Sequence, residues 1–109
     1  MVSFSFTGSS KKTYNYSHIP EAGFNNIPRQ PGNYVIASGE HMRPTPILIR
    51  ACHSVRKALL DEGDRLAASE KHGAIALYVH FDVDGDPDSR QREVDDLISN
   101  YHPPMNKKG

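Results

Sequence analysis

Three cations that follow one another closely in this sequence have the chemistry to bind a phosphate group. Arg50, Arg56 and Lys57 carry guanidinium and ammonium groups, which donate charge-assisted hydrogen bonds to phosphate oxygens. Charged side chains at a surface are often simply solvated, so the pattern alone does not separate a binding patch from scattered charge. We take these three residues as the candidates for phosphate binding.

Two further residues have the chemistry for proton transfer or metal binding. Glu93 carries a carboxylate, the kind of oxygen ligand that magnesium uses in proteins. His80 lies in a strand-like stretch and can act as a base near neutral pH, although a single strand histidine is more often solvated or hydrogen-bonded. Both are kept as candidate catalytic residues, in case the domain is an active enzyme.

The composition describes one small domain. The chain has 109 residues and one cysteine, with 13 Lys and Arg against 13 Asp and Glu. A neutral chain counts against extensive contact with DNA, because proteins that neutralise many phosphates usually carry a basic excess. The sequence has neither a signal-peptide pattern nor an apolar run long enough to span a bilayer. We expect a soluble cytoplasmic protein without a membrane partner.

The N-terminal quarter predicts strands and then a loop. Residues 2–6 and the stretch around Tyr14 and Tyr16 alternate apolar with polar side chains on either side of a Gly-Ser turn. This pattern predicts a β-hairpin. Its aromatic rings and the two lysines of its turn suit stacking on single-stranded bases, but aromatic alternation is also ordinary strand patterning. Residues 18–32 are rich in Pro, Asn and Gly and predict irregular structure.

Two strands and a divided helix are predicted in the middle of the chain. Residues 32–37 and 46–50 read as strands, separated by a loop with Gly and Pro. Apolar residues from Ser54 onward recur at helical spacing, with Leu66 among those expected to face inward. Gly63 is expected to divide this helical region.

The last part of the chain predicts a strand and a long helix. In residues 74–83 every odd position is apolar and the even positions are mixed, which predicts a strand with one buried face. Asp86 is suited to cap a helix that has Pro87 in its first turn, and Pro103-Pro104 is expected to end it. One helical face is apolar at i, i+3, i+4 and i+7, through Val94, Leu97, Ile98 and Tyr101. The predicted class is α+β, with a small, mostly antiparallel sheet flanked by helices and an N-terminal β-hairpin.

The closing motif D-L-I-x-x-Y-x-P-P-x-N, together with P-G-x-Y at residues 31–34, resembles the GIY-YIG nuclease superfamily with a degenerate catalytic motif. The order strand, strand, helix, strand, helix and Pro-Asn tail is similar to that family. The resemblance spans residues 27–106. It implies that residues 1–26 form an N-terminal hairpin and irregular extension of the same domain, and that residues 107–109 form a tail.

In that family, a tyrosine from each of the first two strands, an arginine of the first helix and a metal-binding glutamate of the last helix form the site. By this resemblance Tyr34 matches the first tyrosine and Asn106 matches the asparagine of the tail. The second element aligns with residues 48–50, which lack a tyrosine. The arginine position falls on Ala58 and the glutamate position on Val94. Three of the four chemical positions have therefore changed.

Glu93 is the residue that would have to replace the missing metal ligand. It precedes Val94 by one position, which on a helix is about 100° of rotation. Its carboxylate is therefore expected to point away from the groove, unless the helix is shifted in register. We expect no cofactor, and magnesium or manganese only if Glu93 rebuilds a metal site.

Three hypotheses about function follow. The first is a GIY-YIG-like domain that binds DNA, RNA or a nucleotide phosphate without hydrolysing it. The second is a divergent metal-dependent DNA or RNA endonuclease that uses Glu93. The third is a protein-interaction module, with a homodimer or another protein as partner and no role in nucleic-acid binding.

Overall fold

Five strands form one antiparallel sheet, in the order β1-β2-β5-β3-β4. The computed structural model describes residues 3–39, 43–61, 63–73, 75–82 and 84–106, so the expected tail at 107–109 lies outside the described residues. The strands are β1 (Ser3–Thr7), β2 (Thr13–Ile19), β3 (Gly32–Ser38), β4 (Thr45–Cys52) and β5 (Ala76–Phe81). The predicted α+β class, with a small antiparallel sheet and an N-terminal hairpin, is confirmed.

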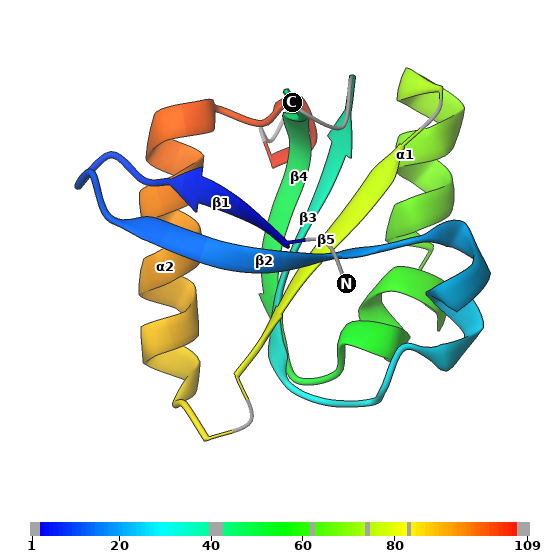
Figure 1. Cartoon of the computed structure of the whole chain (residues 1–109), viewed down its shortest axis with the longest axis horizontal. Coiled ribbons are helices and arrows are strands. Elements are labelled where there is room, and N and C mark those ends of the chain that lie inside the picture. The colour runs from blue at the N-terminus through cyan, green and yellow to red at the C-terminus, as the bar shows by residue number, and fades with distance from the viewer. Residues whose placement is uncertain (1–2, 40–42, 62, 74, 83, 107–109) are drawn as a thin grey trace.

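Helices cover both faces of the sheet (Figure 1). The long helix α2 (Pro87–Tyr101) packs on one face, and α1 (Asp64–His72) lies on the other. Short helical segments complete the structure: η1 (Glu21–Asn26), η2 (Lys57–Asp61) and η3 (Pro104–Asn106). In the part of the chain that the structure describes, no helix is both long enough and apolar enough to cross a membrane.

The N-terminal hairpin joins the sheet through a short contact between β2 and β5. Only residues 17–19 of β2 pair with β5, with His18 opposite Tyr78. Beyond that contact β2 leaves β5 and runs with β1 toward α2, as Figure 1 shows. The hairpin therefore packs beside α2. The predicted irregular region 18–32 holds the end of β2 and the helix η1.

Each face of the sheet carries its own apolar cluster. The cluster on the α1 side includes Tyr34, Leu48 and Leu59, and the cluster on the α2 side includes Val94 and Leu97. Successive strand residues point to opposite faces, so neighbours such as Tyr34 and Val35 in β3 belong to different clusters. This alternation decides which polar side chains meet α2.

Both ends of α2 follow the predicted signals. The carboxylate of Asp86 accepts a hydrogen bond from the backbone N–H of Ser89 at 2.7 Å, and Pro87 is the first helical residue. The helix ends at Tyr101, and His102 adopts a left-handed conformation (φ 49°) before the two prolines. A capped helix with a fixed start sets the phase of its side chains relative to the sheet.

The helical region after β4 is divided at Gly63, as predicted, but Leu66 does not face inward. Gly63 has a φ of 79° and precedes α1. Leu66 is 56 % exposed, whereas Ala68 is fully buried. The prediction for Leu66 is wrong because a new helix begins after Gly63. The helical spacing counted from Val55 therefore does not continue into α1.

Candidate functional site

Three polar side chains converge on one oxygen of Glu93. The Tyr16 hydroxyl donates to Oε2 at 2.7 Å, and the Asn33 amide donates to it at 3.0 Å. The His80 Nδ1 lies 2.9 Å from the same oxygen. These partners come from β2, β3 and β5, and Glu93 comes from α2 with only 12 % of its side chain exposed. A single carboxylate oxygen thus joins the helix to three strands.

The hydrogen bonds around Glu93 favour the ionised pair. Burial would raise the pKa of Glu93, but the bonds from His80, Tyr16 and Asn33 outweigh it and lower that pKa below its ordinary value. The bond to Glu93 raises the pKa of His80 more than burial lowers it. Burial and the neighbouring carboxylate raise the pKa of Tyr16, so its hydroxyl stays protonated as a donor.

The imidazole of His80 is fixed on one side and open on the other. Its Nδ1 contacts Glu93, and its ring lies edge-on to the Tyr16 ring with centroids 5.5 Å apart. The side chain is nevertheless 37 % exposed. A histidine held at Nδ1 by a carboxylate has a defined orientation and exchanges protons through Nε2. His80 therefore has the geometry of a general base.

A second carboxylate fastens the hairpin turn to α2. Asp96 Oδ1 accepts from the Ser10 N–H at 2.8 Å, and Oδ2 accepts from the Ser10 and Tyr14 hydroxyls at 2.6 and 2.8 Å. These bonds from Ser10 lower the pKa of Asp96. A Cβ added at Gly8 would collide with the Asp96 carboxylate, so a larger residue there would displace that side chain. The turn is held close enough to α2 to form one wall of a pocket.

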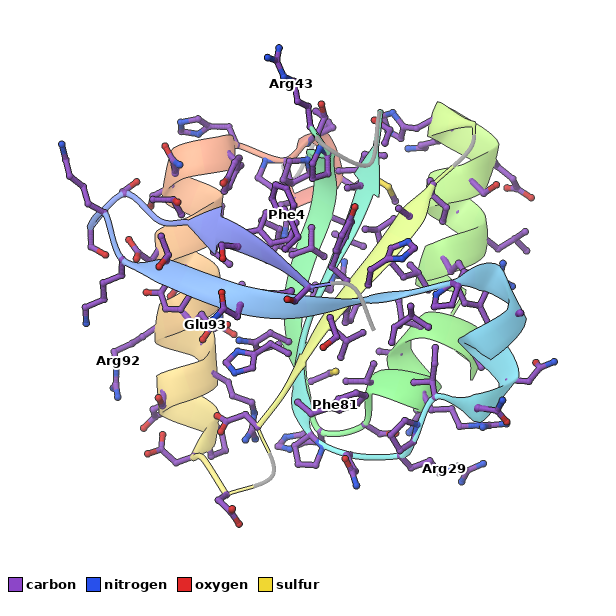
Figure 2. All side chains as sticks on the ribbon, in the orientation of Figure 1. Phe4, Arg29, Arg43, Phe81, Arg92 and Glu93 are labelled. Carbon is purple, nitrogen blue, oxygen red and sulfur yellow. The ribbon has the colours of Figure 1, made fainter. Side chains whose placement is uncertain are left out.

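A polar pocket of about 400 Å³ lies between the hairpin turn and α2. We call it the hairpin pocket; it is lined by Ser10, Lys12, Tyr14, Ser89, Arg92, Glu93 and Asp96. Both of its carboxylates already accept hydrogen bonds from the protein. Among the described residues, neither Lys12 nor Arg92 makes an ion pair within 4 Å. Figure 2 shows Arg92 extending from α2 away from the sheet. The pocket therefore offers two cations and the hydroxyl of Ser89 to a ligand.

A larger, apolar space opens where β2 leaves β5. We call it the apolar hollow; its volume is about 680 Å³, and it is lined by Ser17, His18, Ile19, Pro20, Gly23, Asn26, Ile27, Pro28 and Phe81. Phe81 is the residue after His80, and Ser17 is the residue after Tyr16. Because successive strand residues point to opposite faces, the hollow lies on the α1 side of the sheet, across from the residues that contact Glu93.

The residues matched by family resemblance have structural contacts. Val94 is 2 % exposed and packs in the cluster on the α2 side, as its apolar stripe predicts. Tyr34 packs in the cluster on the α1 side, across the sheet from Glu93. The Asn106 amide accepts from the Ile49 N–H at 2.8 Å and donates to the Ile49 carbonyl at 2.9 Å. This asparagine thus forms hydrogen bonds with the backbone at the outer edge of β4.

The three candidate phosphate-binding cations have different environments. Arg56 is half-buried, and its guanidinium donates to the carbonyls of Asn25 and Ile27 at 2.8 and 3.2 Å. Arg50 lies on β4 opposite Tyr34, and Lys57 begins η2; both are exposed. Arg56 thus binds the chain around η1.

Glu93 and His80, the two alternatives for catalysis, lie in direct contact. The Glu93 carboxylate reaches the sheet, on the face opposite Tyr34. The reason is that α2 packs against two partners: Val94 faces the apolar cluster, and Glu93 faces the hairpin and the end of β5. A rotation of about 100° takes Glu93 from one partner to the other, not into solvent.

The sequence reasoning missed Tyr16, Asn33 and Asp96 as partners in this site. One signal was present, since Ser89, Glu93, Asp96 and Asn100 recur at helical spacing beside the apolar stripe. All four face the hairpin or its pocket, and the Asn100 amide donates to the Thr7 carbonyl at 2.7 Å. A polar stripe next to an apolar one indicates a second, hydrogen-bonded packing partner for the helix.

The residues around Glu93 do not fit the divalent ion that the family resemblance implies. Magnesium needs several oxygen ligands in near-octahedral geometry. Oε2 of Glu93 already accepts from three protein donors, which a metal ion would have to displace. Within the described parts of the chain, no three His, Cys, Asp or Glu side chains gather closely enough to hold a metal ion.

Comparisons of the chain with models of protein families, with curated proteins and with solved structures find no match. The assignment of function therefore rests on the two features described above, the convergence on Glu93 and the hairpin pocket beside it.

Proposed function

We propose that the chain binds single-stranded nucleic acid in the hairpin pocket, without the metal-dependent hydrolysis that the resemblance to GIY-YIG nucleases implies. The observation that carries the proposal is the state of the charges in that pocket. Glu93 and Asp96 accept hydrogen bonds within the fold, and the bonds from Ser10 together with the nearby charge of Lys12 lower the pKa of the Asp96 carboxyl. Arg92 lines the same pocket and makes no ion pair within 4 Å among the described residues.

The chemistry of the pocket suits a phosphodiester backbone. The guanidinium of Arg92 and the ammonium of Lys12 donate to phosphate oxygens, and the hydroxyl of Ser89 donates to a phosphate or sugar oxygen. Tyr14 adds an aromatic ring at the wall of the pocket, a feature that stacks on unpaired bases. These groups together match one nucleotide of a flexible strand.

The limited number of cations favours a single strand over a duplex. The chain as a whole is neutral, with 13 basic and 13 acidic residues. A duplex binder neutralises many phosphates at once, whereas a pocket with two cations neutralises about two. For a single strand the expected salt dependence is about 0.7 per phosphate, or a log–log slope of about −1.4.

A metal-dependent nuclease is less well supported by the site. Tyr34 and Glu93 lie on opposite faces of the sheet, so the tyrosine matched by resemblance does not join the carboxylate. Arg56 donates to backbone carbonyls near η1. These placements favour binding over the family's hydrolysis.

The binding proposal is tested by titrating a fluorescein-labelled, mixed-sequence 2′-O-methyl RNA oligonucleotide and following fluorescence anisotropy at several salt concentrations. Lys12→Ala and Arg92→Ala are each expected to raise the dissociation constant about five- to tenfold, because each removes one charged phosphate contact. Arg29→Ala and Arg43→Ala are matched controls, since both are exposed cations that project far from Arg92 in Figure 2. The controls are expected to change the constant less than twofold.

Two outcomes would count against this proposal. Absence of salt-sensitive binding favours the protein-interaction hypothesis. A loss of affinity in Arg50→Ala with none in Arg92→Ala moves the ligand to the cations predicted from the sequence, Arg50 on β4 and Lys57 after it.

A further inference from the structure

A second pocket with a charged side chain lies on the other side of the sheet, between α1 and the end of β2 (Figure 1). We call it the α1 pocket; its volume is about 360 Å³, and its lining includes Ile19, Phe24, Arg65, Ser69 and Ile75. The three apolar residues of this lining pack against the cluster on the α1 side. The α1 pocket is therefore separate from the hairpin pocket, whose walls come from the hairpin and α2.

The pocket forms because α1 presents small side chains to the sheet. Arg65, Ala68 and Ser69 lie at i, i+3 and i+4 and therefore share one face of the helix. Ala68 is fully buried, so this is the face that packs on the sheet. The large apolar side chain of α1, Leu66, points to solvent instead. Alanine and serine therefore leave space beside the sheet.

Arg65 is held in place but has no hydrogen-bond acceptor. Its guanidinium carbon lies 5.2 Å from the centroid of the Phe24 ring, a cation–π contact that orients the group. In the part of the chain that the structure describes, Arg65 makes neither a hydrogen bond nor an ion pair. Its Nε is buried without a partner, whereas the two terminal nitrogens are not buried. Those two nitrogens are therefore available to a ligand.

Ser69 adds a second donor one helical turn after Arg65. Its hydroxyl makes no hydrogen bond with any described residue. His18 also lines the pocket, but its ring lies beside that of Tyr78, with centroids 5.3 Å apart, and Tyr78 belongs to the cluster on the α2 side. Among the described residues of the lining, Arg65 is therefore the only one with a permanent charge.

We propose that the α1 pocket binds a small organic carboxylate with an apolar body. A planar carboxylate accepts two parallel hydrogen bonds from the terminal nitrogens of one guanidinium, and the Ser69 hydroxyl supplies a further donor. One guanidinium balances one negative charge, so a phosphate ester with two charges is matched less well. The apolar body lies against Ile19 and Ile75. The volume of the pocket falls within the range of small-molecule sites.

The space next to the α1 pocket favours an alkyl body. Residues 18–20 line both this pocket and the apolar hollow, and both spaces lie on the α1 side of the sheet. An alkyl chain that leaves the pocket across these residues meets further apolar walls. The hollow has no charged side chain in its described lining, so the carboxylate belongs at Arg65.

The test is a titration of the full ¹⁵N-labelled chain with sodium octanoate at neutral pH, followed by amide chemical shifts. We expect a dissociation constant below about 1 mM, with the largest shifts in residues 19–24 and 65–69. Octanamide has the same chain without the charge, and acetate has the charge without the chain. Both are expected to bind about tenfold more weakly or less.

Variants of Arg65 test the charge from the side of the protein. Arg65→Gln keeps a polar side chain without the charge and is expected to raise the dissociation constant for octanoate about tenfold. Arg65→Lys keeps the charge without the planar fork and is expected to fall between this variant and wild type. Lys71→Ala is the matched control, because Lys71 is an exposed cation of the same helix outside the pocket; a change below about twofold is expected.

The outcomes separate the site from its assigned chemistry. Equal affinity of wild type for octanoate and octanamide overturns the role of the charge, and this comparison needs no variant that could fold poorly. No amide shifts at about 5 mM octanoate, or shifts centred on residues 10–14 and 89–96, overturn the site. Arg65→Gln is expected to bind the 2′-O-methyl oligonucleotide as wild type does, so the two proposals fail independently.

Discussion

Replacing Glu93 with alanine is expected to lower the free energy of unfolding by about 3 kcal/mol, the cost of removing one partner from a buried, charge-assisted network. The Tyr16 hydroxyl and the Asn33 amide are both buried, and each loses its bond to Oε2. Urea unfolding followed by circular dichroism measures the change. Asp95→Ala is the matched control, because Asp95 is an exposed carboxylate of the same helix whose bond to Gln91 is also exposed. If Glu93→Ala lowers the free energy of unfolding no more than Asp95→Ala does, the hydrogen bonds to Glu93 do not stabilise the fold as described.

The same comparison is expected to depend on pH. The pKa of Glu93 is lowered in the fold, so its contribution is present above its ordinary value of 4.5 and is lost as pH falls through the folded value. The pKa of His80 is raised, so its contribution is present below its ordinary value of 6.5 and is lost as pH rises through the folded value. The difference in stability between wild type and Glu93→Ala should therefore be largest between pH 4.5 and 6.5.

Replacing Gly32 with alanine is the second change with a large expected effect, a loss of about 2–3 kcal/mol from overpacking. A Cβ at this position would lie 2.5 Å from the His80 carbonyl oxygen and 3.0 Å from the Phe81 Cα. Both are backbone atoms of β5, so the end of that strand must move away from β3. The movement also displaces His80 from Glu93. Chemical denaturation measures the loss, and the His80 ring resonances report the displacement.

Gly23→Ala provides the control for this substitution. Its Cβ would contact the Ile19 side chain at 3.7 Å, an ordinary packing distance. This variant is expected to change stability by less than about 1 kcal/mol. If Gly32→Ala is equally mild, the close approach of β3 and β5 is not as described.

Local signals predict most of the elements. Asp86 and Pro87 mark the start of α2, the two prolines mark its end, and Gly63 divides the preceding helical region, because each acts on its own backbone. The apolar stripe of α2 likewise places Val94 in the core. These features depend on neighbours within a few residues, which the sequence shows directly.

The site could not be predicted in the same way. Tyr16 and Asn33 lie 77 and 60 residues from Glu93 in the chain. They meet because β5 inserts between β2 and β3, a pairing that alternation within each strand does not specify. The orientation of Glu93 depends on the hairpin beside α2, which the apolar stripe alone does not reveal. Leu66 shows the same limit on a smaller scale, since its burial depends on where α1 begins.

Chemical-shift mapping tests the central claim most directly, namely that the hairpin pocket holds a single nucleic-acid strand. A ¹⁵N-labelled protein is titrated with the 2′-O-methyl RNA oligonucleotide. We expect the largest amide shifts in residues 10–14 and 89–96, the segments that form the pocket. Shifts confined to residues 50–57, or no shifts at saturating oligonucleotide, would contradict the claim.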